Sequence, residues 1–174
     1  FRIGIGIVIY YSRIKKDGGK YVSRLAASFV ENETDPNAMI PEYKGQIKRG
    51  IAWWGEETEE NITQPISDEE YIRSCLGIFG FKPYGNEDTG TTIIIPYVDS
   101  EKLLSNHQVE YLGGNDQQII PFWCHRIEDY LSISAQRWYA PRLNNPNYTH
   151  GAYLRLSING VGIGTDSMEP VFKA

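Results

Sequence analysis

The sequence predicts an α+β protein with a mainly antiparallel sheet and covering helices. Three observations lead to this class: an Ile-, Val- and Tyr-rich hairpin opens the chain, a second hairpin closes it, and two stretches with helical spacing lie between them. The 174 residues, 41% hydrophobic and 22% charged, suit one ordinary domain, or one domain plus an attached fragment, and not two independent cores. This composition excludes wholesale disorder, collagen-like repeats and a coiled coil.

The opening hairpin consists of two strands joined by a polar turn. Residues 1–13 have the composition of a buried strand, and residues 21–29 form its partner. The turn between them contains Gly18 and Gly19, which accept positive φ without steric cost.

The segment after this hairpin is less regular. Residues 30–50 show little periodicity and predict an irregular connection. A short apolar stretch, residues 51–55, contains Trp53 and Trp54, and we expect both rings in the core. The acidic run at residues 56–60 is expected to be a solvated loop.

The first helix is predicted to start at residue 67. The Ser67 hydroxyl can cap the amide of Glu70, while the Glu70 carboxylate reaches back. Apolar residues then recur at three- and four-residue spacing and predict a buried face: Tyr71, Ile72, Cys75, Leu76 and Phe79. The helix should stop between residues 77 and 80, ahead of a loop over 82–89.

Residues 91–98 (TTIIIPYV) form the strongest predicted strand, because β-branched residues dominate it. Pro96 indicates an edge position or the end of the strand. With residues 1–98 assigned to a first domain, the polar residues 99–117 are predicted to be a linker and residues 118–174 the start of a second, α/β domain.

The second domain is predicted to contain one helix and one hairpin. The helix begins near Pro121 and ends at Pro141, which lacks an amide hydrogen. The hairpin spans residues 153–163 around Asn159-Gly160, a pair suited to a tight turn. The helix carries a wide apolar stripe: Phe122, Trp123, Ile127, Tyr130, Leu131 and Trp138.

The charge and the composition of the chain argue against two classes of partner, nucleic acids and membranes. With 22 acidic and 17 basic side chains the formal charge is −5, which disfavours general nucleic-acid binding. The apolar runs are far shorter than the ~20 residues of a membrane span. Cys75 and Cys124 are expected to be buried thiols of a reducing compartment, rather than a disulfide, which favours a cytoplasmic location.

Common catalytic motifs are absent from the sequence. The Gly4-Ile5-Gly6 start lacks the third glycine of a dinucleotide fingerprint and continues as a strand; no phosphate-binding G-x-x-x-x-G-K-[ST] loop follows. No metal-ligand spacing is present. A hydrolase using His125 or His150 remains an alternative that needs a Ser or Cys within hydrogen-bond reach.

Several segments, taken in order, resemble one family. Residues 6–29 (GIVIYYSRIKKDGGKYVSRLAASF) look like the hairpin that follows the glycine-rich lid in GHKL (Bergerat-fold) ATPases, and residues 89–97 (TGTTIIIPY) look like their last nucleotide motif. The bacterial Hsp90-like ATP-binding proteins found with defence systems are the most similar lineage. Shorter matches to these proteins are Ser12-Arg13, residues 50–55, Pro65-Ile66, residues 137–143 (RWYAPRL), residues 154–160 (LRLSING) and residues 168–174 (MEPVFKA).

This resemblance implies the rear half of a Bergerat ATP-binding fold, with ATP and Mg²⁺ as cofactors. It implies that the Thr91 hydroxyl helps to hold the adenine and that Gly90 permits close backbone approach. It implies nucleotide binding as a conformational switch. The Glu- and Asn-bearing helix, the Asp-x-Gly-x-Gly segment and the lid of the family are not found in residues 1–174. We therefore expect no ATP hydrolysis by this chain alone and assign it no catalytic or metal-binding residue.

Two functions follow for the chain as a whole. Because it begins at Phe1 within an apolar strand pattern, we expect it to be a fragment of a longer polypeptide. The first function is the nucleotide-binding portion of an Hsp90-like ATPase of a bacterial defence system, with a protein partner or a homodimer as further partners. The alternative is a non-catalytic protein-interaction module whose aromatic side chains pack against a partner.

Overall fold

The computed structural model describes residues 6–32, 34–35, 37–40, 50–59, 62–101, 103–104, 123–143, 154–164 and 166–173. The chain divides into two compact units, Phe1–Val98 and Asp99–Ala174, and each is described by itself. Together they contain helices and antiparallel strands, so the predicted α+β class is confirmed. Most of the predicted 99–117 linker, His107 and His150 lie outside the described residues.

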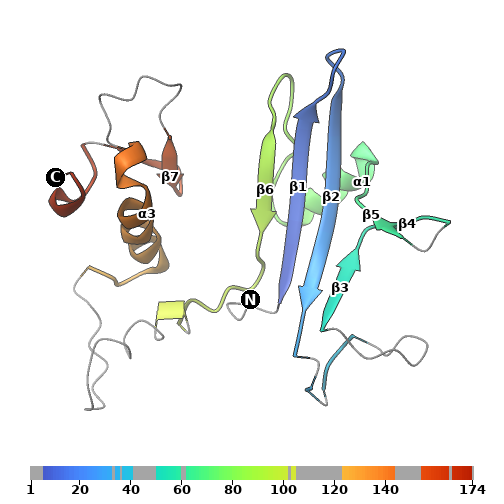
Figure 1. Ribbon diagram of the computed structural model, residues 1–174, viewed down its shortest axis with the longest axis horizontal. Coiled ribbons are helices and arrows are strands. Elements are labelled where there is room, and N and C mark those ends of the chain that lie inside the picture. Colours follow the sequence, from blue (N-terminus) through green and yellow to red (C-terminus); the bar gives the residue numbers. More distant parts are fainter. Residues whose placement is uncertain are drawn as a thin grey trace. The chain divides into compact units, whose positions relative to one another are not determined.

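The N-terminal unit is built on a four-stranded antiparallel sheet in the order β3-β2-β1-β6 (Figure 1). The opening hairpin is confirmed, since Ile7 pairs with Phe29 at one end and Lys15 with Tyr21 at the turn. Gly18 and Gly19 adopt φ of +83° and +79°, as the turn requires. The bounds of the four strands are β1 Ile7–Lys15, β2 Tyr21–Val30, β3 Ile51–Trp54 and β6 Gly90–Ile94.

The predicted strand over 91–98 is shorter than expected. β6 ends at Ile94, two residues before Pro96, which agrees with a proline at the strand end. The loop predicted at residues 56–60 is wrong in part, because Glu56–Glu57 (β4) pairs with Thr63–Gln64 (β5). Both short strands are exposed, as the acidic composition predicts for Glu56 and Glu57.

Helix α1, Glu69–Ile78, crosses one face of the sheet. Its cap differs from the prediction: Asp68, not Ser67, is the N-cap, and the Asp68 carboxylate accepts a 2.7 Å hydrogen bond from the Tyr71 amide. A carboxylate at this end also suits the helix dipole. At the other end Gly80 has φ +76°, and the Phe81 amide donates to the Leu76 carbonyl, which closes a Schellman turn.

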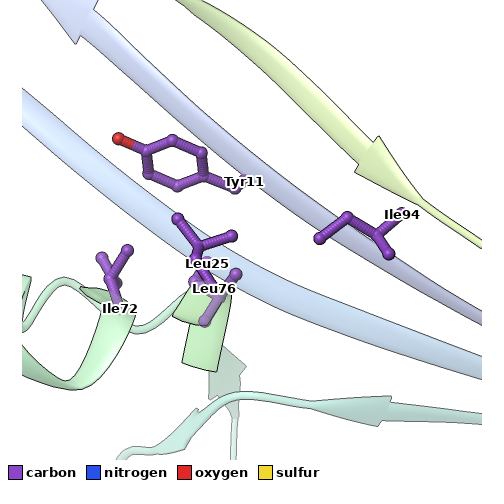
Figure 2. Packing of buried hydrophobic residues seen from close by; sticks show 5 residues of the cluster. All are labelled: Tyr11, Leu25, Ile72, Leu76 and Ile94. Carbon is purple, nitrogen blue, oxygen red and sulfur yellow. The ribbon is translucent and has the colours of Figure 1, made fainter. Parts of the chain in front are cut away.

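The core of this unit lies between α1 and the sheet. Figure 2 shows its five buried side chains, which come from three strands and the helix: Tyr11, Leu25, Ile72, Leu76 and Ile94. Two predicted helix core residues, Tyr71 and Phe79, are instead exposed, and Cys75 is half-buried rather than buried. Ile72 and Leu76 are the residues of α1 that are buried against the sheet. The apolar stripe seen in the sequence is therefore wider than the part of the helix that is buried.

The prediction that Trp53 and Trp54 lie in the core is wrong. Trp53 is 60% exposed and Trp54 is 41% exposed. Both are on β3, which among the described strands has one neighbour, β2, and forms the edge of the sheet. Trp54 lies on the same side as α1 and contacts Tyr71, with ring centroids 6.1 Å apart, whereas Trp53 points to the opposite side.

The two faces of the sheet differ in what covers them. The helix face carries Tyr11, Ser23, Leu25, Ala27 and Ile94, all buried. The opposite face, called the open face below, has no helix on it among the residues described between 6 and 98; in Figure 1 α1 lies behind the sheet. By strand alternation the open face carries Val8, Tyr10, Ser12, Ile14, Val22, Arg24, Ala26, Ser28, Ile51, Trp53, Thr91 and Ile93.

The C-terminal unit consists of helix α3 (Ile127–Leu143), strands β7 (Leu156–Ile158) and β8 (Val161–Ile163), and a 3₁₀ turn, η1 (Pro170–Phe172). The hairpin turn at Asn159-Gly160 is confirmed, with φ of +50° and +79°. The helix boundaries were predicted wrongly: residues 123–126 are not helical, and Pro141 lies inside the last turn. Leu143, two residues later, is buried, so its packing favours continuation past the proline.

The start of α3 is fixed by Asp129. Its Oδ2 accepts hydrogen bonds from the amides of Arg126 and His125, and its Oδ1 accepts one from the Arg126 guanidinium at 3.2 Å. Desolvation raises the pKa of the Asp129 carboxyl, but the hydrogen bonds from Arg126 and His125 outweigh this effect. The pKa therefore lies below its usual value, and the carboxylate caps the helix start.

The apolar stripe predicted for this helix is not the buried side. Leu131 and Trp138 are exposed, and Trp138 retains 76% of its accessible surface. The side that packs against the hairpin carries Gln136 and Leu143 instead. Gln136 is accommodated because its Nε2 donates to Ser132 Oγ and its Oε1 accepts from the Glu169 amide.

Candidate functional site

The predicted site residues Gly90 and Thr91 are the first two residues of β6. Gly90 is paired with Arg13, and Thr91 is paired with Ser12 on the neighbouring strand β1. Because successive residues of a strand point to opposite faces, Gly90 belongs to the helix face and Thr91 to the open face. The two residues therefore face different surroundings.

On the helix face, Gly90 is packed against Tyr84. A β-carbon at Gly90 would lie 2.9 Å from Cζ of Tyr84 and 3.0 Å from its hydroxyl oxygen. The Tyr84 ring is held in place because it stacks on Tyr11 at 5.4 Å and its hydroxyl lies 2.9 Å from Thr92 Oγ1. Because Gly90 has no side chain, the Tyr84 ring can lie close to its backbone. On the helix face this space is therefore filled by a residue of the chain itself.

Arg13 forms hydrogen bonds that hold the loop at residues 85–88, which leads into β6. Its Nη1 donates to the carbonyl oxygens of Gly85, Asn86 and Asp88 at 3.2, 2.9 and 2.8 Å. Its guanidinium carbon also lies 4.3 Å from the ring centroid of Tyr21. In the sequence Ser12-Arg13 is only part of a motif, and a separation of more than 70 residues gives no local signal of this contact.

On the open face, Thr91 is exposed and stands beside Ser12. Within the part of the chain that the structure describes, neither hydroxyl makes a side-chain hydrogen bond, so both can donate to and accept from a ligand. The next row across the sheet places Tyr10 beside Ile93, which is 59% exposed. Two free hydroxyls next to a flat apolar row can bind a heterocycle by its polar edge and by its face.

A separate hollow of about 590 Å³ lies at the C-terminal end of α1. Its lining includes Arg73, Phe81, Lys82 and Tyr84, so it is on the helix side of the sheet. Thr91 does not line it, and the hollow and the hydroxyl pair are two distinct features. The hydroxyl pair is the candidate site, because the predicted site residue Thr91 is accessible there.

The described residues suit the nucleoside of ATP better than they suit the Mg²⁺ ion. The hydroxyl pair and its apolar neighbours suit a nucleoside. Among the described residues, no group of three or more His, Cys, Asp or Glu side chains is placed to hold a metal ion. These residues therefore offer no protein-made magnesium site, and a metal there would depend on the phosphates of a bound nucleotide.

The hydrolase alternative gains no support from the residues around His125. Cys124, its neighbour, is buried, and desolvation together with the negative charge of Asp129 raises the pKa of its thiol. The thiol therefore stays protonated at neutral pH and is a poor nucleophile. The His125 side chain is exposed, and its backbone amide serves the cap of α3.

Comparison with known proteins returned no relative: no protein-family model, curated protein or solved structure matches this chain. Within the described ranges, neither α1 nor α3 has the length and apolar character needed to cross a bilayer.

Proposed function

We propose that this chain is the nucleotide-binding portion of an Hsp90-like ATP-binding protein, of the kind found with bacterial defence systems, and that it works in the cytoplasm with nucleotide as a conformational switch. The observation that carries the proposal is the position of Thr91. Its side chain is exposed on the open face, next to Ser12, at the point where the resemblance to Bergerat-fold ATPases requires a hydroxyl that faces adenine.

The chemistry of the site suits this role. A hydroxyl both donates and accepts, so Thr91 can bind a purine edge directly or through one water molecule. Tyr10 and Ile93 offer an apolar surface one row away, against which the base can pack. Hydrolysis is not part of the proposal, because the described residues contain no metal-binding cluster to position the phosphates and a water molecule.

The test is a titration of the chain with ATP, with and without magnesium, for the native protein and for Thr91→Val. Valine keeps the shape and removes the hydroxyl, so we expect about a tenfold loss of affinity, equal to about 1.4 kcal/mol. Thr92→Val is the matched control: Thr92 is on the helix face and is bonded to Tyr84, so it should leave affinity unchanged. Equal affinity of the native and Thr91→Val proteins would remove Thr91 from the site.

A second function, a non-catalytic protein-interaction module, is favoured by a different observation. The open face carries exposed apolar side chains on three strands, at Ile14, Ile51, Trp53 and Ile93. Exposed apolar patches of this kind mark interaction surfaces. The reading frame upstream of Phe1 separates the two proposals, because an Asn-bearing helix and an Asp-x-Gly-x-Gly segment there favour the ATP-binding protein, whereas a nearby start codon favours the module.

A further inference from the structure

One row of the open face combines a cation with two hydroxyl groups. Ser12 on β1 is paired with Arg24 on β2 and with Thr91 on β6. The three residues therefore lie side by side across the sheet, with Ser12 in the middle. Neighbouring strands are about 4.8 Å apart, so the backbones at Arg24 and Thr91 are separated by roughly 10 Å.

The Arg24 side chain is exposed, and no described carboxylate forms an ion pair with it. Within the described ranges its side chain makes no hydrogen bond, ion pair or ring contact, and the ion pair found there, Arg126–Asp129, is in the other unit. Arg13 shows the contrast. It lies on the same hairpin but on the helix face, and it is fully engaged by three carbonyl groups and the Tyr21 ring.

The row next to it supplies an apolar surface. Ala26, Tyr10 and Ile93 lie side by side in the same three strands, one row further from the hairpin turn. A ligand on the Arg24 row can thus place a ring on Tyr10 and Ile93 while its polar groups reach the hydroxyls and the guanidinium. A free guanidinium binds a phosphate through two parallel hydrogen bonds, and its planar shape makes it better suited to this than a lysine.

We propose that Arg24 binds a phosphate group of a nucleoside phosphate whose base lies against Thr91, with Ser12 between them. This inference rests on the proposed nucleotide function and adds to it a residue that distinguishes nucleotides from nucleosides. No covalent step is involved. Arg24 acts as a binding residue that selects the charged ligand.

The experiment compares the affinities of adenosine and ADP for the full chain in four forms: native, Arg24→Gln, Arg73→Gln and Thr91→Val. Arg24→Gln should weaken ADP binding about tenfold and leave adenosine binding unchanged, because only ADP carries phosphate. Arg73→Gln is the matched control, since Arg73 is an exposed arginine on α1, on the other side of the sheet. It should change neither affinity. Circular dichroism checks that each variant is folded.

The outcomes separate the two proposals. If ADP binds Arg24→Gln as tightly as the native chain while Thr91→Val weakens both ligands, the role of Arg24 is overturned and the nucleotide function stands. Equal losses for Arg24→Gln and Arg73→Gln would show a general charge effect and also overturn the role of Arg24. If the native chain binds neither adenosine nor ADP, or if Thr91→Val binds both as the native chain does, the proposed site itself is overturned.

Discussion

The two faces of the N-terminal sheet are made from the same strands but have opposite properties. Ile94 and Ile93 are neighbours on β6, yet Ile94 is 7% exposed beneath α1 and Ile93 is 59% exposed on the open face. The difference arises because, among the residues described between 6 and 98, helix α1 covers one side of the sheet and no helix covers the other. In this unit the described core therefore lies on the helix face, whereas Arg24, Thr91 and Ile93 of the open face are exposed and available for recognition.

Truncating both isoleucines is the most direct test of this difference between the two faces. Ile94→Ala removes buried methyl groups beside Tyr11 and Leu25, and we expect the free energy of unfolding to fall by about 2–5 kcal/mol. Ile93→Ala removes mostly exposed surface and should cost less than about 1 kcal/mol. Denaturant unfolding followed by circular dichroism measures both values. Similar losses for the two variants would show that the open face is buried by something in solution.

The packing at Gly90 gives a second test. An added methyl group collides with the Tyr84 ring, so Gly90→Ala should lower the free energy of unfolding by about 1–3 kcal/mol. If Tyr84 is the cause, the same substitution should cost much less when Tyr84 is already alanine. A double-mutant cycle measures this coupling. Costs that simply add would contradict this contact between Gly90 and the Tyr84 ring.

The smallest expected effect concerns the cap of α1, the helix that creates the difference between the faces. Asp68→Ala removes the acceptor of the Tyr71 amide and should cost about 1 kcal/mol of unfolding free energy. Ser67→Ala, one position earlier, should have almost no effect. The pair is measured by thermal or urea unfolding under identical conditions. A larger loss for Ser67→Ala would restore the cap predicted from the sequence.

Much of the secondary structure was predictable because it depends on local properties. The opening hairpin, the Asn159-Gly160 turn and the end of β6 ahead of Pro96 follow from strand composition, positive φ and the missing proline amide. The cap of α1 was missed by one residue, since Ser67 and Asp68 are both good capping residues and only the backbone geometry at Asp68 distinguishes them.

The burial of individual side chains was less predictable. Trp53, Trp54 and Trp138 are large and apolar, which favours a core position, but all three are exposed. Gln136, a polar residue, is buried because two hydrogen bonds satisfy its amide. Periodicity identifies a helix or a strand, but it does not state which side has a neighbour to pack against.

For the candidate site, the sequence by itself determined that a Gly-Thr pair opens a β-branched strand and that Ser12-Arg13 belongs to the first hairpin. Only the tertiary structure decided that Gly90 faces Tyr84 and that Thr91 faces away from it, beside Ser12 and in line with Arg24. The physical reason is that strand register joins residues far apart in the chain, and the position of one helix then decides which of two alternating sides is buried.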